Sequence, residues 1–343
     1  MDMQVRLTQF SHGGGCGCKI APGVLEQILS KVKPGLIPKE LLVGIETSDD
    51  AAVYQINEHQ AIVATTDFFM PIVDDPFDFG AIAATNAISD VYAKSGRPPI
   101  VGMPVNQIPL EVIRKILEGG ESVCARAGIP VAGGHTIDSV EPIYGLVAIG
   151  LVDPKRVKRN NGARPGDAVV LGKPLGVGIY SAALKKGQLD DAGYRAMIDS
   201  TTRLNTPGTK LGTIEGVHAL TDVTGFGLLG HLVEIAKGSK VMAEIDWASL
   251  PLLPKTLELA REGIFTGASA RNWAGYGSFV ELGPNVAEAE RTILTDPQTS
   301  GGLLVACDPA STQDVLAAFG DEGFSQARVI GYIRAGAPRV SVV

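Results

Sequence analysis

The sequence predicts an α/β protein built from two domains. Strand-like and helix-like segments alternate in both halves of the chain, which is typical of this class. The length of 343 residues is roughly twice an average domain of about 150 residues. A polar, basic and turn-rich stretch at 153–166 separates the halves. We expect a flexible loop rich in glycine and cysteine at 1–20, an N-terminal domain at 21–155 and a C-terminal domain at 156–343.

The N-terminal half alternates short apolar runs with longer amphipathic ones. Apolar runs bounded by polar residues or glycine predict strands, and apolar residues at helical spacing predict helices. The helix predicted at 79–94 has a clear stop signal, because Gly96 is followed by Pro98. By these criteria the expected strands are 41–46, 51–56, 61–66, 100–105, 129–132 and 143–151, and the expected helices are 22–33, 79–94 and 110–127.

The C-terminal half repeats this alternation, beginning with a strand at 168–171. The expected helices are 177–186, 194–205, 227–237 and 254–262, and the later strands are 241–245, 302–306 and 328–332. The mixed order predicts an α/β or α+β sandwich in each half.

Composition argues against nucleic acid and membrane as partners. The chain has 30 basic and 37 acidic residues, a net charge of −7, and its densest basic run, 155–159, has the character of a solvated linker. The longest apolar run, near 143–152, has about half the ~20 residues that a membrane span requires. Residues 1–6 lack the apolar core of a signal peptide. We therefore expect a cytoplasmic protein.

The four cysteines fall into two groups. Cys124 and Cys307 lie in apolar patterns and are expected to be buried. Cys16 and Cys18 lie among glycines, in a segment that we expect to be mobile and without a core to bury it. Two thiols with one spacer cannot complete a tetrahedral metal site. A redox pair is possible, although the usual Cys-x-x-Cys spacing is lacking. The remaining interpretations are a disordered tail or a thiolate favoured by the ammonium of Lys19, which could also neutralise phosphate charge.

Two glycine-rich segments were tested against phosphate-binding motifs. The segment 14–20 is not a Walker A loop, because Ile20 follows Lys19 where a serine or threonine is required. The segment 225–230 matches Gly-x-Gly-x-x-Gly, but 219–224 before it is a poor candidate for a buried strand. We interpret 225–230 as a tight turn into a helix rather than as a dinucleotide site.

Two further glycine-rich turns follow or precede predicted strands. Gly133, Gly134 and His135 could allow a nucleotide to approach the backbone closely, or could form a simple turn. The segment 296–302 is interpreted as a structural turn that feeds a buried strand, and its hydroxyls are also able to bind an anion.

Five aspartates carry the clearest chemical signal: Asp49, Asp50, Asp67, Asp90 and Asp222. Any one of them is explained as a cap or turn residue. Together they are unusual, because four lie at predicted strand ends or turns and Asp90 shares a helix face with Asn86. Carboxylate oxygens suit Mg²⁺, which takes its other ligands from phosphates and water. The pattern indicates Mg²⁺-nucleotide phosphoryl transfer, and a thiol beside such a site indicates a sulfur- or selenium-like substrate.

Seven blocks of sequence resemble, in order, the signature blocks of the selenophosphate synthetase (selenide, water dikinase) family. They are 13–19, 49–53, 65–71, 85–90, 133–135, 220–227 and 296–302. The match spans nearly the whole chain. The cysteine block makes it specific within the superfamily that also holds aminoimidazole ribonucleotide synthetase and thiamine-monophosphate kinase.

The resemblance implies a fold and a reaction. The fold is the two-domain aminoimidazole ribonucleotide synthetase-like fold, with an N-terminal mixed sheet that joins a dimer barrel and a C-terminal α/β sandwich. The reaction converts ATP, selenide and water into selenophosphate, AMP and phosphate, and supplies activated selenium for selenocysteine and selenouridine. The implied cofactor is Mg²⁺, with room for a monovalent cation such as K⁺. The implied partners are a second copy of the chain and a transient selenium-delivery protein.

The resemblance also assigns residues, block by block. Cys16 and Lys19 are implied as catalytic. The implied nucleotide contacts are Lys19, Thr47, Ser48, Asp49, Asp67, Asp90, Gly133, Gly134 and His135, and the implied metal ligands are Asp50, Asp90 and Asp222. The alternative is a related ATP-dependent synthetase or small-molecule kinase of the same superfamily, which would keep the acids but would not need Cys16 and Cys18.

Overall fold

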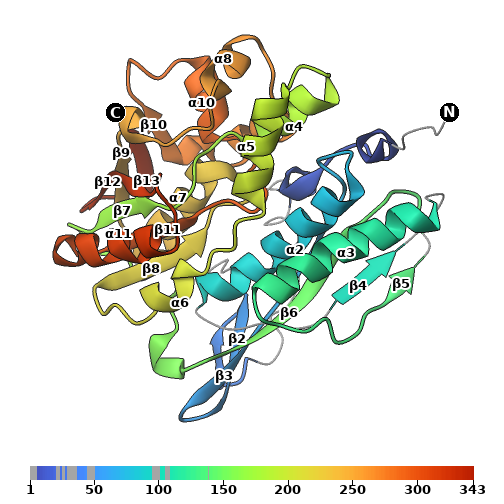
Figure 1. Cartoon of the computed structure of the whole chain (residues 1–343). Helices are drawn as coiled ribbons and strands as arrows, with labels where there is room; N and C mark the ends of the chain where they lie inside the picture. The colour runs from blue at the N-terminus through green and yellow to red at the C-terminus, as the bar shows by residue number, and fades with distance from the viewer. Residues whose placement is uncertain are drawn as a thin grey trace.

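The computed structural model describes residues 6–20, 24, 28, 37–44, 51–94, 101–104, 109–137 and 139–343. In this part of the chain two sheets with their helices form the two halves (Figure 1). The predicted α/β class and the two-domain fold are confirmed. The described part contains no helix that is both long and apolar enough to cross a bilayer.

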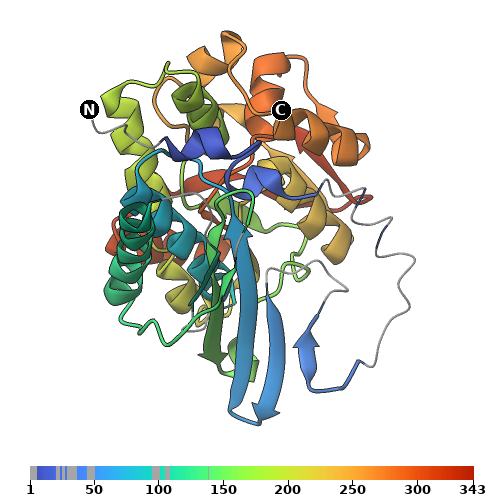
Figure 2. The ribbon, with the colours of Figure 1, turned by 90° about the vertical axis from the view of Figure 1, so that its right-hand side faces the viewer.

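The N-terminal sheet has the order β1-β2-β3-β6-β4-β5. Its strands are β1 (Leu41–Val43), β2 (Ala52–Asn57), β3 (Gln60–Phe69), β4 (Val101–Pro104), β5 (Thr136–Ile137) and β6 (Tyr144–Val152). Neighbours pair antiparallel except β4 and β5, which are parallel, so the sheet is mixed, as predicted. Figure 2 shows the long β2–β3 hairpin extending away from the C-terminal half.

Two helices, α2 (Pro76–Ala93) and α3 (Leu110–Arg126), pack on the N-terminal sheet. The helix α2 is buried along nearly its whole length, because it lies between this sheet and the C-terminal domain. Its Val91 packs with Val53, Val63 and Ala148 of the sheet. Since side chains alternate along a strand, the intervening residues of β2, β3 and β6 point to the other face.

The C-terminal sheet has the order β10-β13-β9-β12-β7-β11-β8. Its strands are β7 (Ala168–Leu171), β8 (Val217–Asp222), β9 (Met242–Ile245), β10 (Val280–Leu282), β11 (Leu303–Cys307), β12 (Arg328–Arg334) and β13 (Arg339–Val342). Its helices are α4 (Val177–Lys185), α5 (Asp191–Thr201), α6 (Pro207–Leu211), α7 (Gly227–Ser239), α8 (Thr256–Arg261), α9 (Gly267–Tyr276), α10 (Glu288–Leu294) and α11 (Thr312–Asp321).

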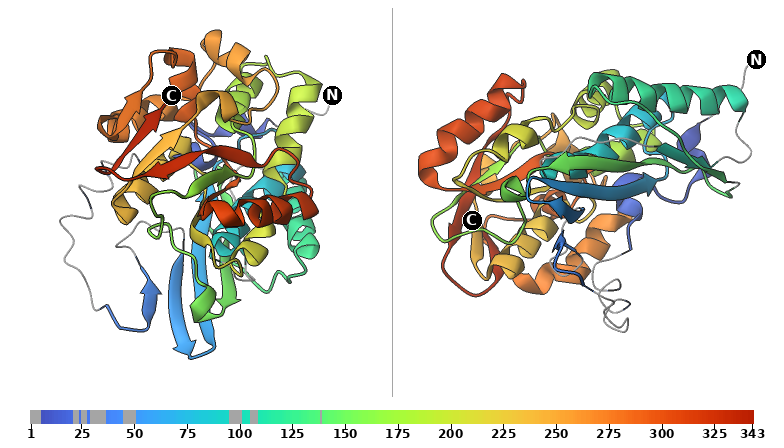
Figure 3. Two further views of the ribbon diagram at one scale, coloured as in Figure 1. Left: turned by 90° about the vertical axis from the view of Figure 1, so that its left-hand side faces the viewer. Right: turned by 90° about the horizontal axis from the view of Figure 1, so that it is seen from below.

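Helices cover both faces of the C-terminal sheet. Val169 and Leu171 of β7 pack with α7, whereas Ala168 and Val170 pack with α11. All four are buried, as period-two alternation requires in a strand covered on both sides. Figure 3 shows α11, in red, lying across the sheet.

Most predicted elements are present with shifted ends, and several predictions were wrong. Residues 129–132 form no strand, and β5 begins only at Thr136. The sequence does not favour a buried strand directly before Gly225, but β8 is a buried strand that ends at Asp222. It pairs antiparallel with β11, so the glycine motif after it does not open a βαβ dinucleotide unit. The helix predicted at 22–33 lies outside the described residues apart from 24 and 28, which are helical.

Candidate active site

The glycine-rich segment 11–19, which we call the arm, is folded against both domains. It contains a short 3-10 turn, η2 (Gly15–Cys18). The backbone N–H of Gly15 donates to the carbonyl of Met70 at 2.8 Å, and Arg271 donates to the carbonyl of Gly17 at 3.0 Å. The arm therefore lies between the end of β3 and helix α9, beside the upper part of α2 in Figure 1.

Two glycines make room for the arm. Gly15 has φ +55°, and a Cβ there would lie 2.2 Å from Oγ1 of Thr299. A Cβ on Gly225 would lie 2.5 Å from the carbonyl oxygen of Cys16. Glycine at 225 thus serves the approach of the arm, whereas Gly227, with φ +68°, forms the turn into α7 that the sequence predicted.

Cys16 is buried, which corrects the expectation that the arm has no core to cover it. Its side chain is 1% exposed, its N–H donates to Oγ1 of Thr299 at 3.2 Å, and its Sγ donates to Oδ1 of Asn86 at 3.2 Å. Burial, and then the carboxylate of Asp67, raise the pKa of this thiol well above its usual value, and Lys19 only partly opposes them. With the arm in this position, burial and the nearby carboxylates favour the thiol of Cys16 over the thiolate that Lys19 would favour.

Asn86 joins three parts of the site. It is fully buried on α2, and its Oδ1 accepts both the Cys16 thiol and the N–H of Ser300, the latter at 2.6 Å. Its Nδ2 donates to the carboxylate of Asp67. Sequence reasoning placed Asn86 on the helix face of Asp90 but gave it no role. The position four residues before Asp90 was the available signal.

Three of the predicted acids gather around the arm from separate elements. Asp67 lies within β3, Asp90 lies on α2, and Asp222 is the last residue of β8. All three are buried. Thr65 donates to Asp90 at 2.5 Å, and Ser89 donates to Asp222. The structure therefore brings Asp67, Asp90 and Asp222 to Cys16, although Asp67 does not end its strand as predicted.

Lys19 is held in its charged form by this acidic surrounding. Burial of the ammonium opposes the charge, but Asp67, then Cys16 and the other acids raise the pKa of Lys19 above its usual value. The residue as a whole is exposed, and a Cβ on Gly225 would lie 3.2 Å from its Cδ. A cation on the arm thus faces several buried carboxylates.

Of the remaining predicted site residues, those that the structure describes do not join this cluster. Thr47, Ser48, Asp49 and Asp50 lie outside the described residues. Gly133, Gly134 and His135 are exposed between α3 and β5, and a Cβ on Gly133 would meet nothing within 4 Å. Within the part of the chain that the structure describes, therefore, no close approach requires glycine at 133.

The segment 296–302 is both structural and part of the site. Asp296 accepts the N–H groups of Gly178 and Ile179, and Gln298 accepts those of Gly176 and Val177, so the two side chains cap α4. Burial raises the pKa of Asp296 to about 7. These capping contacts agree with the interpretation of 296–302 as a structural turn. The contacts of Thr299 and Ser300 with Cys16 and Asn86 were not foreseen.

The donors present suit Mg²⁺ but do not by themselves complete a site. Within the described ranges, no group of three His, Cys, Asp or Glu side chains could hold a metal ion. Asp90 and Asp222 supply hard carboxylate oxygens, and Mg²⁺ is commonly bound by one or two carboxylates together with substrate phosphates. Asp50, the third predicted ligand, lies outside the described residues.

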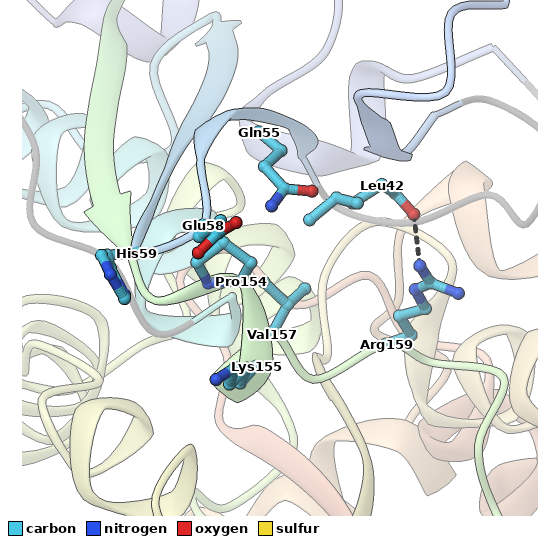
Figure 4. Close-up of a pocket in the computed structure, with 8 residues that line it drawn as sticks. All are labelled: Leu42, Gln55, Glu58, His59, Pro154, Lys155, Val157 and Arg159. Carbon is cyan, nitrogen blue, oxygen red and sulfur yellow. Dashed lines mark hydrogen bonds between the residues drawn. The ribbon is translucent and has the colours of Figure 1, made fainter.

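A separate cavity of about 510 Å³ lies away from this cluster. It is formed by the turn between β2 and β3, by β1 and by the stretch that links the domains, and Arg159 donates across it to the carbonyl of Leu42 at 2.6 Å (Figure 4). Its lining residues are Leu42, Gln55, Glu58, His59, Pro154, Lys155, Val157 and Arg159. It shares no residue with the predicted site. We therefore place the candidate active site at the buried acids and not in this cavity.

Comparison with known proteins defines first the class and then the family. Residues 48–152 match the model for the N-terminal domain of AIR synthase related proteins, and residues 164–343 match the model for their C-terminal domain. The solved thiamine-monophosphate kinase of Stenotrophomonas maltophilia K279a has the same fold, with a TM-score of 0.64 at 21% identity over 95% of this chain and 96% of its own. The protein is thus of the AIR synthase related class.

Two relatives of known sequence identify the family within this class. The selenide, water dikinase of Pseudomonas straminea is 65% identical over 347 residues, which cover 100% of this chain and 97% of that protein. The selenide, water dikinase of Paraburkholderia xenovorans (strain LB400) is 64% identical over 98% of this chain and 97% of its own length. The chain therefore belongs to the selenide, water dikinase family.

Proposed function

We infer that this chain catalyses the ATP-dependent synthesis of selenophosphate from selenide and water, releasing AMP and phosphate. The observation that carries the inference is the arm itself. In a chain 65% identical to a selenide, water dikinase, it sets a cysteine and a lysine against three buried carboxylates. The product would supply activated selenium for selenocysteine and selenouridine.

We propose the following roles for the site residues. Lys19, kept charged by the acids, stabilises the oxygens of the phosphoryl group during transfer. Cys16 holds or delivers the selenium, and the arm excludes water while it is closed. The proposed nucleotide contacts besides Lys19 are Thr47, Ser48, Asp49, Asp67, Asp90, Gly133, Gly134 and His135.

Mg²⁺ is the proposed cofactor, with Asp50, Asp90 and Asp222 as its ligands. When bound, it would screen the charge of the triphosphate. Asp90 and Asp222 are already oriented by hydrogen bonds from Thr65 and Ser89, which fix the carboxylates before any ion arrives.

We also propose that two copies of the chain pair through the uncovered face of the N-terminal sheet. This face is apolar: Tyr54, Ile56, Phe68 and Leu151 are each between 42% and 55% exposed. Tyr54 pairs with Ile62, and Ile62 pairs with Leu151, so these apolar residues form a row across β2, β3 and β6. A continuous exposed apolar face favours burial against a partner.

We place the enzyme in the cytoplasm. All four cysteines are free thiols in the structure, and the proposed reaction requires Cys16 to stay reduced. A reducing compartment meets that requirement.

Anaerobic ³¹P NMR of the protein with ATP, Mg²⁺ and selenide tests the reaction, beside a control without selenide. A selenium-coupled phosphorus signal, with AMP and phosphate in equal amounts, is expected. Cys16→Ala should lose that signal, whereas the matched control Cys124→Ala, a buried cysteine of α3, should keep it. Accumulation of ADP without the signal would instead assign the chain to the synthetases or kinases acting on other substrates.

A further inference from the structure

Lys173 is a buried lysine that the proposed reaction does not use. It follows β7 by two residues and is 2% exposed. Its Nζ donates to two backbone carbonyls, that of Arg203 at 2.7 Å and that of Ser300 at 2.8 Å. Burial lowers the pKa of Lys173 to about 7, although Asp222 partly counteracts it. A lysine in such a place is costly to the fold, so its contacts call for an explanation.

Ser300, one of its two partners, has an unusual backbone. Its φ is +52°, in the left-handed region that residues other than glycine seldom occupy. The hydroxyl does not compensate, because Oγ is buried and has no hydrogen-bond partner within the described part of the chain. This conformation directs the N–H of Ser300 to Asn86 at 2.6 Å while its carbonyl receives Lys173. Backbone strain of this kind is characteristic of functional sites.

The hydrogen bonds continue from Ser300 to the thiol. Asn86 Oδ1, which accepts the N–H of Ser300, also accepts the Sγ of Cys16 at 3.2 Å. The neighbouring Thr299 accepts the backbone N–H of Cys16. Lys173 thus lies at the far end of a chain of contacts that runs through the 296–302 segment and α2 to the arm. A displacement of Ser300 would remove one partner of Asn86 and would shift the neighbouring Thr299, and these are the two residues that hold Cys16.

We propose that Lys173 is a positioning residue for Cys16, which acts by fixing the carbonyl of Ser300 so that Asn86 and Thr299 hold the thiol in its buried place. Asn205 donates to the carbonyl of the next residue, Gly301, at 2.9 Å and limits how far the segment can move. The role of Lys173 is therefore local to Ser300. The expected effect of Lys173 on turnover rests on the proposed function. The position of the Cys16 thiol can be measured in the absence of turnover.

The test is Lys173→Met, which has a similar length and cannot donate. The readout is the rate at which iodoacetamide alkylates Cys16 in the absence of substrates, followed by mass spectrometry of the peptide that carries it. Release of the thiol should raise this rate about tenfold. In the anaerobic assay kcat should fall about tenfold or more, with KM for ATP nearly unchanged, because a displaced reacting group costs turnover rather than binding.

Lys158→Met is the matched control. Lys158 also donates from Nζ to two backbone carbonyls, those of Ile214 and Val217 at 3.0 and 2.8 Å, in the same domain but outside the site. The Lys158→Met variant should leave both the alkylation rate of Cys16 and kcat at wild-type values. If both lysine variants change these quantities alike, the effect is general loosening of the domain and the proposal is wrong.

A second variant separates the loss of the Lys173 hydrogen bonds from misfolding. Lys173→Gln is shorter and can reach at most one of the two carbonyls, and it should raise the alkylation rate in the same direction. Folded Lys173 variants whose Cys16 reacts within about twofold of wild type would overturn the proposal. A wild-type enzyme that makes no selenophosphate would refute the proposed function but would leave the alkylation result in place.

Discussion

At the scale of single residues, the site depends on one amide. Asn86 presents a carbonyl oxygen to the Cys16 thiol and to the N–H of Ser300, and its amino group to Asp67. An aspartate at 86 would set two carboxylates against each other, and an apolar residue would leave buried polar groups without partners. Asparagine offers both an acceptor and a donor in the small space on α2.

Asn86→Ala should therefore impair both stability and turnover. The N–H of Ser300 and one oxygen of Asp67 lose their buried partner, which should lower the free energy of unfolding by about 1–3 kcal/mol. Turnover should fall about tenfold or more, since Cys16 is no longer oriented. Urea unfolding and the anaerobic assay measure the two effects. Asn57→Ala, at the exposed end of β2, is the control, and equal behaviour of both variants would contradict the role of Asn86.

The clustering of three acids follows more directly from the sequence than the burial of the cysteine does. Asp67, Asp90 and Asp222 were found because their residue type and their places near strand ends and on one helix face point to metal-nucleotide chemistry. The burial of Cys16 depends on Thr299, which is 283 residues away in the sequence. A glycine-rich segment shows no periodicity, so only the folded chain reveals what covers it.

At the scale of elements, α4 begins at Val177, and the residue before it, Gly176, has no side chain to cap the helix. Asp296 and Gln298 supply the caps from more than a hundred residues further along the chain, and they also fix the segment that contacts the arm. Sequence reasoning found α4 from its own apolar pattern, but a cap so distant has no local signal. The strand predicted at 129–132 is absent for a different reason. A short apolar run favours a strand locally, but it does not by itself supply a neighbouring strand to pair with.

Asp296 makes stability depend on pH in a defined direction. Its pKa is raised by burial from an ordinary 3.8 to about 7. Between about pH 4 and pH 7 the folded chain thus binds more protons than the unfolded chain, and the contribution of Asp296 to stability is lost as the pH rises through about 7. Asp296→Asn keeps an acceptor for the N–H groups of α4 and removes the buried charge. It should be more stable than wild type at pH 8, by on the order of a few kcal/mol.

Guanidinium unfolding at pH 5 and pH 8 measures this effect. The control is Asp190→Asn at the exposed N-cap of α5, where Lys255 and the N–H of Gly193 lower the pKa of the carboxyl. Asp190 stabilises the fold above its ordinary pKa and loses that effect as the pH falls, which is the opposite sign. If Asp296→Asn were no more stable at pH 8 than at pH 5, relative to wild type, the buried carboxyl would not carry the pH dependence.

At the scale of the whole molecule, the two domains share one site. The helix α2 carries Asn86 and Asp90 and lies between the sheets, the arm crosses it, and the C-terminal domain contributes Asp222 and the 296–302 segment. The two-domain fold could be predicted from the alternation of elements and from the family blocks. The convergence of both domains on α2 could not be predicted from the sequence, because a helix that is apolar around most of its surface does not show which element covers each side.

The exposed face of the N-terminal sheet gives the last prediction, which concerns the proposed pairing of two copies. The inner face of this sheet packs on α2, while Tyr54 and Ile56 of β2 are exposed on the other face with Phe68 of β3. Ile56→Asp places a charge where the second copy would bury it, and an unpaired charge in an apolar interface is strongly unfavourable. The variant should fold and run as a monomer, with about half the wild-type mass by light scattering after size exclusion. Leu110→Asp, which adds the same charge at an 84% exposed position on α3, should keep the wild-type mass. A wild-type chain that is already monomeric at micromolar concentration would mean that this apolar face serves another partner.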